Sequence, residues 1–93
     1  MIHLNQKTWT EINTDIAGRM VKLRKRKKIT QKELSLRAGV SLGSLKRFEQ
    51  SGEISLQSFT KLAIALETEG ELERLFSEVP FQSIEEVLRE QAK

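Results

Sequence analysis

Residues 29–52 read ITQKELSLRAGVSLGSLKRFEQSG, and this stretch decides the fold. Thr30 is followed three residues later by Glu33, a capping box that predicts the start of a helix. This helix is expected to end at Gly39, because glycine readily adopts the left-handed conformation that turns the chain. Ser41 then offers an N-cap oxygen for the next helix, which is the third in the chain. The stretch therefore predicts two short helices separated by the tight turn AGVS.

Apolar residues recur at helical spacing on both sides of this stretch, so nearly the whole chain is predicted to be helical. A first helix is expected to start near Asn13, which offers an N-cap oxygen. Ser55 caps a fourth helix, a short fifth helix covers about 69–78, and a capping box at Ser83 opens a last helix. Val40 is expected to pack in the turn between the second and third helices. The residues expected on the inward faces of the first four helices are Ile12, Ile16, Met20, Leu23, Leu34, Ala38, Leu45, Phe48, Leu56, Phe59, Leu62, Ala63 and Leu66.

Charge is distributed unevenly along the chain. Residues 1–52 hold 12 of the 16 Lys and Arg residues but only 4 of the 13 Asp and Glu residues. Six of the seven residues over 22–28, KLRKRKK, are basic, and they fall at the end of the first predicted helix, where cations complement the helix dipole. A basic half beside an acidic half predicts two surfaces with different partners. The basic surface attracts polyanions, either nucleic acid or anionic lipid.

Composition excludes several classes of protein. The 93 residues fit one domain, and the lack of cysteine excludes disulfides and thiolate metal sites. No apolar run approaches the roughly 18 residues of a membrane span, and the N-terminal residues lack a signal-peptide pattern, so we expect a cytoplasmic protein. His3, the single histidine, has no second ligand at a suitable spacing, and the serines fit caps and turns better than catalysis. We expect no enzyme, cofactor or metal.

One set of residues within 16–66 has a recognisable spacing: Arg24, Gln31, Leu34, Gly39, Val40, Ser41, Leu45, Glu49 and Leu62. With these residues, the stretch resembles the Cro/C1-type (XRE) helix-turn-helix domain of phage repressors and bacterial regulators. Ser35 stands where that family usually has alanine, and Gln50 and Ser51 precede Gly52 where Asn-Gly is usual. The resemblance implies an all-α, five-helix, lambda-repressor-like helix-turn-helix DNA-binding domain with a short C-terminal helical extension. The expected divisions are an N-terminal segment over 1–12, the DNA-binding domain over 13–66 and the extension over 67–93.

A narrower resemblance is to the small HipB-like regulators encoded beside HipA-type kinase toxins. It rests on GSLKRFE at 43–49, on ISL at 54–56, and on the tail LERLF at 72–76 followed by SIEEVL at 83–88. It implies an antitoxin that represses its own operon and contacts a kinase toxin.

The resemblance also implies how DNA is read. The third helix, here about 42–50, lies in the major groove, with its first residues on base edges. Leu42, Gly43 and Arg47 occupy the family's base-reading positions, and Ser41 lies beside them. Arg47 is suited to a bidentate contact with guanine, although a phosphate contact or a solvated charge is the alternative for this residue.

Other residues are assigned to the DNA backbone or to the domain itself. Gln31 and the start of the second helix are implied to hold a phosphate, with a solvent-exposed side chain as the alternative. Arg24 is implied to pair with Glu49 and orient the third helix. The remaining phosphate candidates are Ser44, Lys46, Lys25, Lys28 and Lys32.

Apolar residues near the C-terminus exceed what the domain needs. They offer intrachain packing, a dimer interface or a docking site, and comprise Phe76, Phe81, Ile84, Val87 and Leu88. We favour a homodimer on a pseudo-palindromic double-stranded operator, because two half-sites increase specificity. Trp9 is expected to pack on the core, or alternatively on a second subunit. Two other classes stay open: a protein-interaction adaptor that does not read DNA, and binding to a membrane surface through the basic helix.

Overall fold

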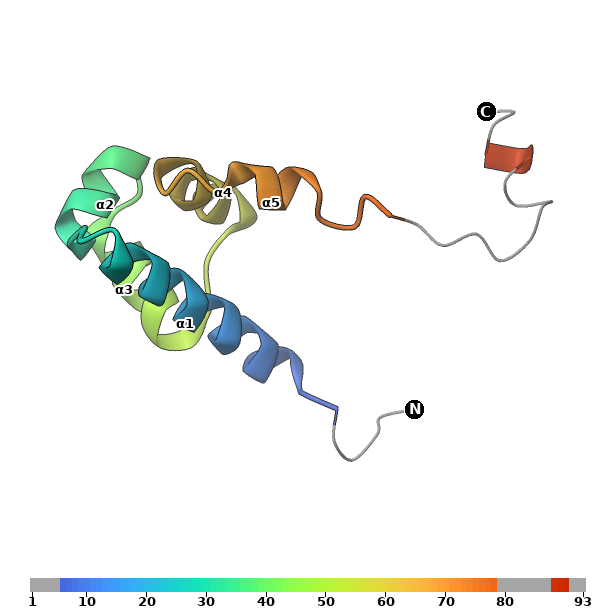
Figure 1. The fold of residues 1–93 in the computed structure, drawn as a ribbon. Helices are drawn as coiled ribbons and strands as arrows, with labels where there is room; N and C mark the ends of the chain where they lie inside the picture. The colour runs from blue at the N-terminus through green and yellow to red at the C-terminus, as the bar shows by residue number, and fades with distance from the viewer. Residues whose placement is uncertain (1–5, 79–87, 91–93) are drawn as a thin grey trace.

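The structure is a computed structural model that describes residues 6–78 and 88–90 of the chain. Within these residues the fold is entirely helical and contains no strand (Figure 1). The predicted all-α fold class is therefore confirmed. The helices are α1 (Trp9–Arg26), α2 (Gln31–Ala38), α3 (Leu42–Ser51), α4 (Leu56–Ala65) and α5 (Glu69–Glu73).

The two central helices begin and end where the caps predict. The Thr30 hydroxyl accepts a hydrogen bond from the backbone nitrogen of Glu33 (3.1 Å), and the Glu33 carboxylate accepts one from the backbone nitrogen of Thr30 (3.4 Å). Gly39 ends α2 with φ at +68°, in the left-handed region. The Ser41 hydroxyl caps α3 by accepting from the backbone nitrogen of Ser44 (3.1 Å). Local side-chain chemistry is sufficient to delimit the helix-turn-helix.

The predicted start of α1 near Asn13 is wrong. The helix begins at Trp9, because Thr8 and Glu11 form a second capping box of the same kind as the one on α2. Asn13 and Asp15 therefore lie inside the helix rather than at its cap. The fifth helix is also shorter than the predicted 69–78, since α5 ends at Glu73.

The core lies where α1 packs on α3, and where α2 packs on both α3 and α4. The rings of Phe48 and Phe59 meet edge to face, with centroids 5.6 Å apart. Leu72 of α5 packs against the same cluster from the edge. The buried apolar residues are Ala17, Met20, Ile29, Leu34, Val40, Leu45, Phe48, Leu62, Ala63 and Leu66.

Three residues expected to face the core are instead exposed. The N-terminal turns of α1 project beyond the other helices (Figure 1), and they leave Trp9 70% and Ile12 46% exposed. The prediction that Trp9 packs on the core is therefore wrong within the described residues. Leu56, the first residue of α4, is 75% exposed because the helix turns its later residues inward.

The structure describes two of the five residues of the predicted C-terminal interface, Phe76 and Leu88. Phe76 is 85% exposed and follows α5 with a positive φ of 58°, and Leu88 is 58% exposed. Residues 88–90 are helical. Phe81, Ile84 and Val87, with most of the helix predicted from Ser83, lie outside the described residues, as does His3. Of the helices that the structure describes, none has the length and apolar character to cross a membrane.

Candidate DNA interface

A buried polar cluster holds the end of α1, the start of α2 and the end of α3 together. Arg24 donates from Nε to Glu49 Oε2 (2.8 Å) and from Nη2 to Glu49 Oε1 (3.0 Å). Its Nη1 donates to the backbone oxygen of Ile29 (2.9 Å). Because the Arg24 and Glu49 side chains are only 9% and 8% exposed, this pair is the expected structural contact and lies within the domain rather than on its surface.

Gln31 joins the same cluster. Its side-chain nitrogen donates to Glu49 Oε1 (2.8 Å), so part of its hydrogen-bonding capacity is directed into the protein. The side chain is half-buried at the first position of α2. One amide hydrogen and the amide oxygen of Gln31 are not used in this bond, and its place at a helix N-terminus suits a phosphate.

The first turn of α3 is open to solvent, as the base-reading assignment requires. A Cβ atom added at Gly43 would meet no atom within 4 Å, so a surface can approach this position closely. Ser41 is exposed, and its hydroxyl donates to the Ser44 hydroxyl (2.8 Å). Leu42 is half-buried and lines a shallow hollow on the α2 side together with Lys32 and Val40.

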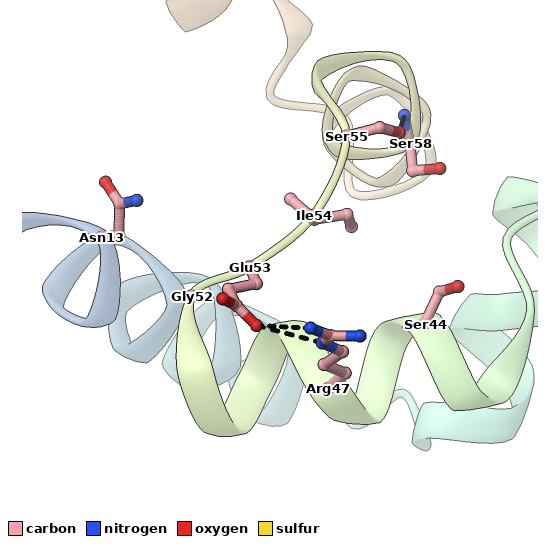
Figure 2. A pocket seen from close by; sticks show the side chains of 8 residues that line it. All are labelled: Asn13, Ser44, Arg47, Gly52, Glu53, Ile54, Ser55 and Ser58. Atoms are coloured by element: carbon pink, nitrogen blue, oxygen red, sulfur yellow. Dashed lines mark hydrogen bonds and ion pairs between the residues drawn. The ribbon is translucent and has the colours of Figure 1, made fainter. Parts of the chain in front are cut away.

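Arg47 lies one turn further along α3 and faces a different hollow from Leu42. Its Nε and Nη2 both donate to Glu53 Oε2, at 3.0 and 2.8 Å (Figure 2). The side chain is 71% exposed and that of Glu53 is 54% exposed. The best candidate for base reading is therefore held by a carboxylate in the free protein, and it stays accessible.

Arg47 and Ser44 line one open groove between α3, the loop after it and α4 (Figure 2). The far wall is the start of α4, where Ser55 caps the helix by accepting from the backbone nitrogen of Ser58 (3.1 Å). Asn13 of α1 borders the groove at its other end. This groove is lined mainly by polar side chains, which suits a polar ligand rather than an apolar one.

The lysines assigned to phosphates are all exposed. Lys25 lies near the end of α1, Lys28 follows that helix with φ at +58°, Lys32 is on α2 and Lys46 is on α3. They place positive charge beside the helix-turn-helix and within reach of a polyanion. One pKa is shifted elsewhere on α1: the hydrogen bond from Lys7 and the charge of Lys7 lower the pKa of Asp15.

Sequence reasoning missed two members of this surface. Glu53 was not singled out, although it holds Arg47, and Asn13 was interpreted only as a cap. The sequence signal that could have located Glu53 was Gly52. This residue adopts a left-handed φ of +77° and returns the chain toward α3. No group of His, Cys, Asp and Glu in the described residues could hold a metal ion.

A protein-family model described as helix-turn-helix matches residues 20–72 of the chain. The chain belongs to the helix-turn-helix family. The match includes the whole of α2, α3 and α4 and most of α5, so it covers the buried cluster and every lining residue of the groove except Asn13. The helix-turn-helix domain is of the Cro/C1 (XRE) type, and the protein is in general terms a DNA-binding transcription regulator. Among curated proteins, no sequence matches the chain.

Proposed function

We propose that this helix-turn-helix protein is a repressor that binds a pseudo-palindromic operator as a homodimer and acts without catalysing a reaction. The observation that supports it best is the arrangement on α3. Gly43 leaves open space, Ser41 and Ser44 are exposed, and Arg47 presents a guanidinium one turn later. A helix with this face can enter the major groove with its first residues on base edges.

The surroundings of α3 support a fixed approach to the DNA backbone. Gln31 lies at the start of α2 and is oriented by Glu49, whose other oxygen is held by Arg24. The buried cluster would therefore fix the position of a phosphate bound at Gln31 relative to α3. Backbone contacts of this kind set the orientation of a protein on DNA, and base contacts then supply the specificity.

A homodimer is supported by the small number of base contacts that one domain of this size can make. Two copies on half-sites about 34 Å apart place both recognition helices on one face of the duplex. Exposed apolar residues, among them Trp9 and Phe76, offer surface for such an association. Sedimentation of the free protein tests this part directly, and a monomer at all concentrations would contradict it.

The narrower role that we propose is a HipB-like antitoxin. It is supported by the sequence resemblance over 43–49 and 54–56. We expect the protein to regulate its own operon and to contact a kinase toxin encoded beside it. Co-purification with the product of a neighbouring kinase gene would support this role, and a neighbourhood without such a gene would contradict it.

An adaptor that binds protein rather than DNA is the second function to test. The observation that favours it is the exposure of large apolar side chains, with Leu36 on α2 and Leu56 on α4 each 75% exposed. A protein partner that covered these side chains would bury apolar surface, which favours association. Under this function, Arg47→Ala and Gln31→Ala would leave the partner interaction unchanged.

The test of the leading proposal is fluorescence anisotropy on the DNA upstream of the protein's own gene, with a scrambled fragment of equal length as control. Both fragments are titrated across a salt series, because phosphate contacts weaken steeply with salt. A preference for the upstream fragment that persists as salt rises supports an autoregulator. Equal and steeply salt-dependent binding to both fragments would contradict it.

A further inference from the structure

Glu53 lines the same groove as Ser44 and Arg47, two residues that the proposed function places against DNA. A carboxylate facing a phosphate backbone is unfavourable, so a DNA-binding surface with an exposed glutamate needs a physical reason for it. The described part of the chain offers one contact for this carboxylate, the pair of hydrogen bonds from Arg47 to its Oε2 (Figure 2).

The two bonds use one edge of the guanidinium and leave another. Nε and Nη2 form the side edge of the group, and both donate to Glu53 Oε2 at 3.0 and 2.8 Å. A guanidinium has five N–H donors, so both hydrogens of Nη1 and one of Nη2 remain. One hydrogen of Nη1 and the remaining hydrogen of Nη2 form the end edge, and within residues 6–78 and 88–90 the structure shows no partner for it. A guanine presents two acceptors, O6 and N7, which suit two parallel donors.

Glu53 is held in place by the turn that ends α3. Its backbone nitrogen donates to the Ser51 hydroxyl (3.2 Å), and that hydroxyl donates to the backbone oxygen of Arg47 (2.7 Å). Gly52 lies between Ser51 and Glu53, has a left-handed φ of +77°, and is close to the backbone of Asn13. Arg47 and Glu53 are therefore connected twice, once through their side chains and once through Ser51.

We infer that Glu53 is a positioning residue for sequence reading, a role that rests on the proposed function. It holds the side edge of Arg47 so that the end edge is presented to a guanine in the major groove. It also acts as an internal counter-ion that weakens contact between Arg47 and phosphates. Both effects favour specific over random DNA, even though an exposed ion pair contributes little to the stability of the fold.

The experiment selects bound sequences from a random DNA pool with the wild type, Glu53→Gln, Glu53→Asp and Glu73→Gln. Glu73→Gln makes the same chemical change on the exposed end of α5, away from the groove, and serves as the matched control. Glu53→Asp keeps the charge but withdraws the carboxylate by one methylene group. It therefore separates positioning from simple repulsion. Thermal unfolding of each variant verifies that the domain is intact.

We expect the wild type and Glu73→Gln to select guanine at one position of each half-site. Both substitutions of Glu53 should reduce that preference about two- to fivefold, the range in which an exposed ion pair acts. On a random duplex, Glu53→Gln should bind tighter than Glu73→Gln, and this excess should become smaller when Arg47 is replaced by alanine.

The two levels of the account fail differently. If the wild type selects a sequence and both Glu53 variants select it equally well, the positioning role is wrong and the proposed function stands. If the wild type selects no sequence, the proposed function is wrong and the positioning role fails with it. If Glu53→Asp keeps the full guanine preference, charge alone accounts for the effect and positioning is overturned.

Discussion

Arg24 and Glu49 lie 25 residues apart in the sequence, and their side chains form a buried ion pair in which each carboxylate oxygen accepts from a different guanidinium nitrogen. The pair connects the end of α1 to the end of α3, and Gln31 extends it to the start of α2. The recognition helix is thus oriented by a contact that is itself shielded from water. The orientation of α3 therefore depends on an ion pair whose two side chains are almost fully buried.

We expect Glu49→Gln to destabilise the domain by about 3 kcal/mol, because it leaves the buried Arg24 charge without its counter-ion. Equilibrium unfolding in denaturant measures the change. Arg37→Met is the control, since it removes an exposed ion pair to Glu33 (3.7 Å) and should cost less than about 1 kcal/mol. Equal losses in the free energy of unfolding for the two variants would show that the buried ion pair stabilises the domain no more than the exposed one.

The two left-handed glycines should differ in their response to alanine. At Gly39 an added Cβ meets no atom within 4 Å, so the cost is that of the backbone conformation alone, about 1–2 kcal/mol. At Gly52 an added Cβ would lie 2.8 Å from the backbone carbon of Asn13. Gly52→Ala should therefore cost about 1–3 kcal/mol more than Gly39→Ala in the same unfolding assay. A smaller loss at Gly52 would mean that the loop does not pack on α1 as described.

The early start of α1 can be tested at its cap. Thr8→Ala removes the hydroxyl that accepts from the backbone nitrogen of Glu11 (3.2 Å) and should cost about 1 kcal/mol. Backbone chemical shifts over 9–12 should move toward coil in this variant and be helical in the wild type. Coil shifts at those residues in the wild type would place the helix start nearer Asn13 after all.

Asp15 should titrate below its ordinary value of 3.8, because Lys7 donates a hydrogen bond to its carboxylate (2.6 Å) and adds a positive charge. A lowered native pKa makes the contribution to stability complete above the unfolded value, and it is lost as pH falls through the native pKa. NMR titration should show the Asp15 pKa rising toward 3.8 in Lys7→Met. An unchanged pKa in that variant would rule out the ion pair as its cause.

Local chemistry made the helix-turn-helix predictable from sequence. The Thr30–Glu33 box, the left-handed Gly39 and the Ser41 cap each act over a few residues, so their spacing was enough to locate α2 and α3. The Arg24–Glu49 pair joins distant residues, and only the family resemblance indicated it. The start of α1 was wrong because Asn13 looked like a cap while the stronger box at Thr8 was overlooked.

The Arg47–Glu53 contact could not be predicted from helical spacing. The two residues are six apart, which places them on different faces of a continuous helix. They meet because Gly52 reverses the chain after α3, and such a turn depends on the space left by Asn13 of α1. The exposure of Trp9 was missed for a related reason, since its helical pattern does not reveal that α1 extends past its neighbours.

The central claim is that α3 reads base pairs through Arg47, and the most direct test compares Arg47→Ala with Lys25→Ala on an operator substituted at each position in turn. Lys25 is exposed near the end of α1 and serves as the backbone-contact control. We predict that Arg47→Ala loses about 1–3 kcal/mol at one position and relaxes the preference there. Lys25→Ala should instead weaken all sequences alike and lower the salt slope by about 1. Equal losses by Arg47→Ala on operator and random DNA would contradict base reading by this helix.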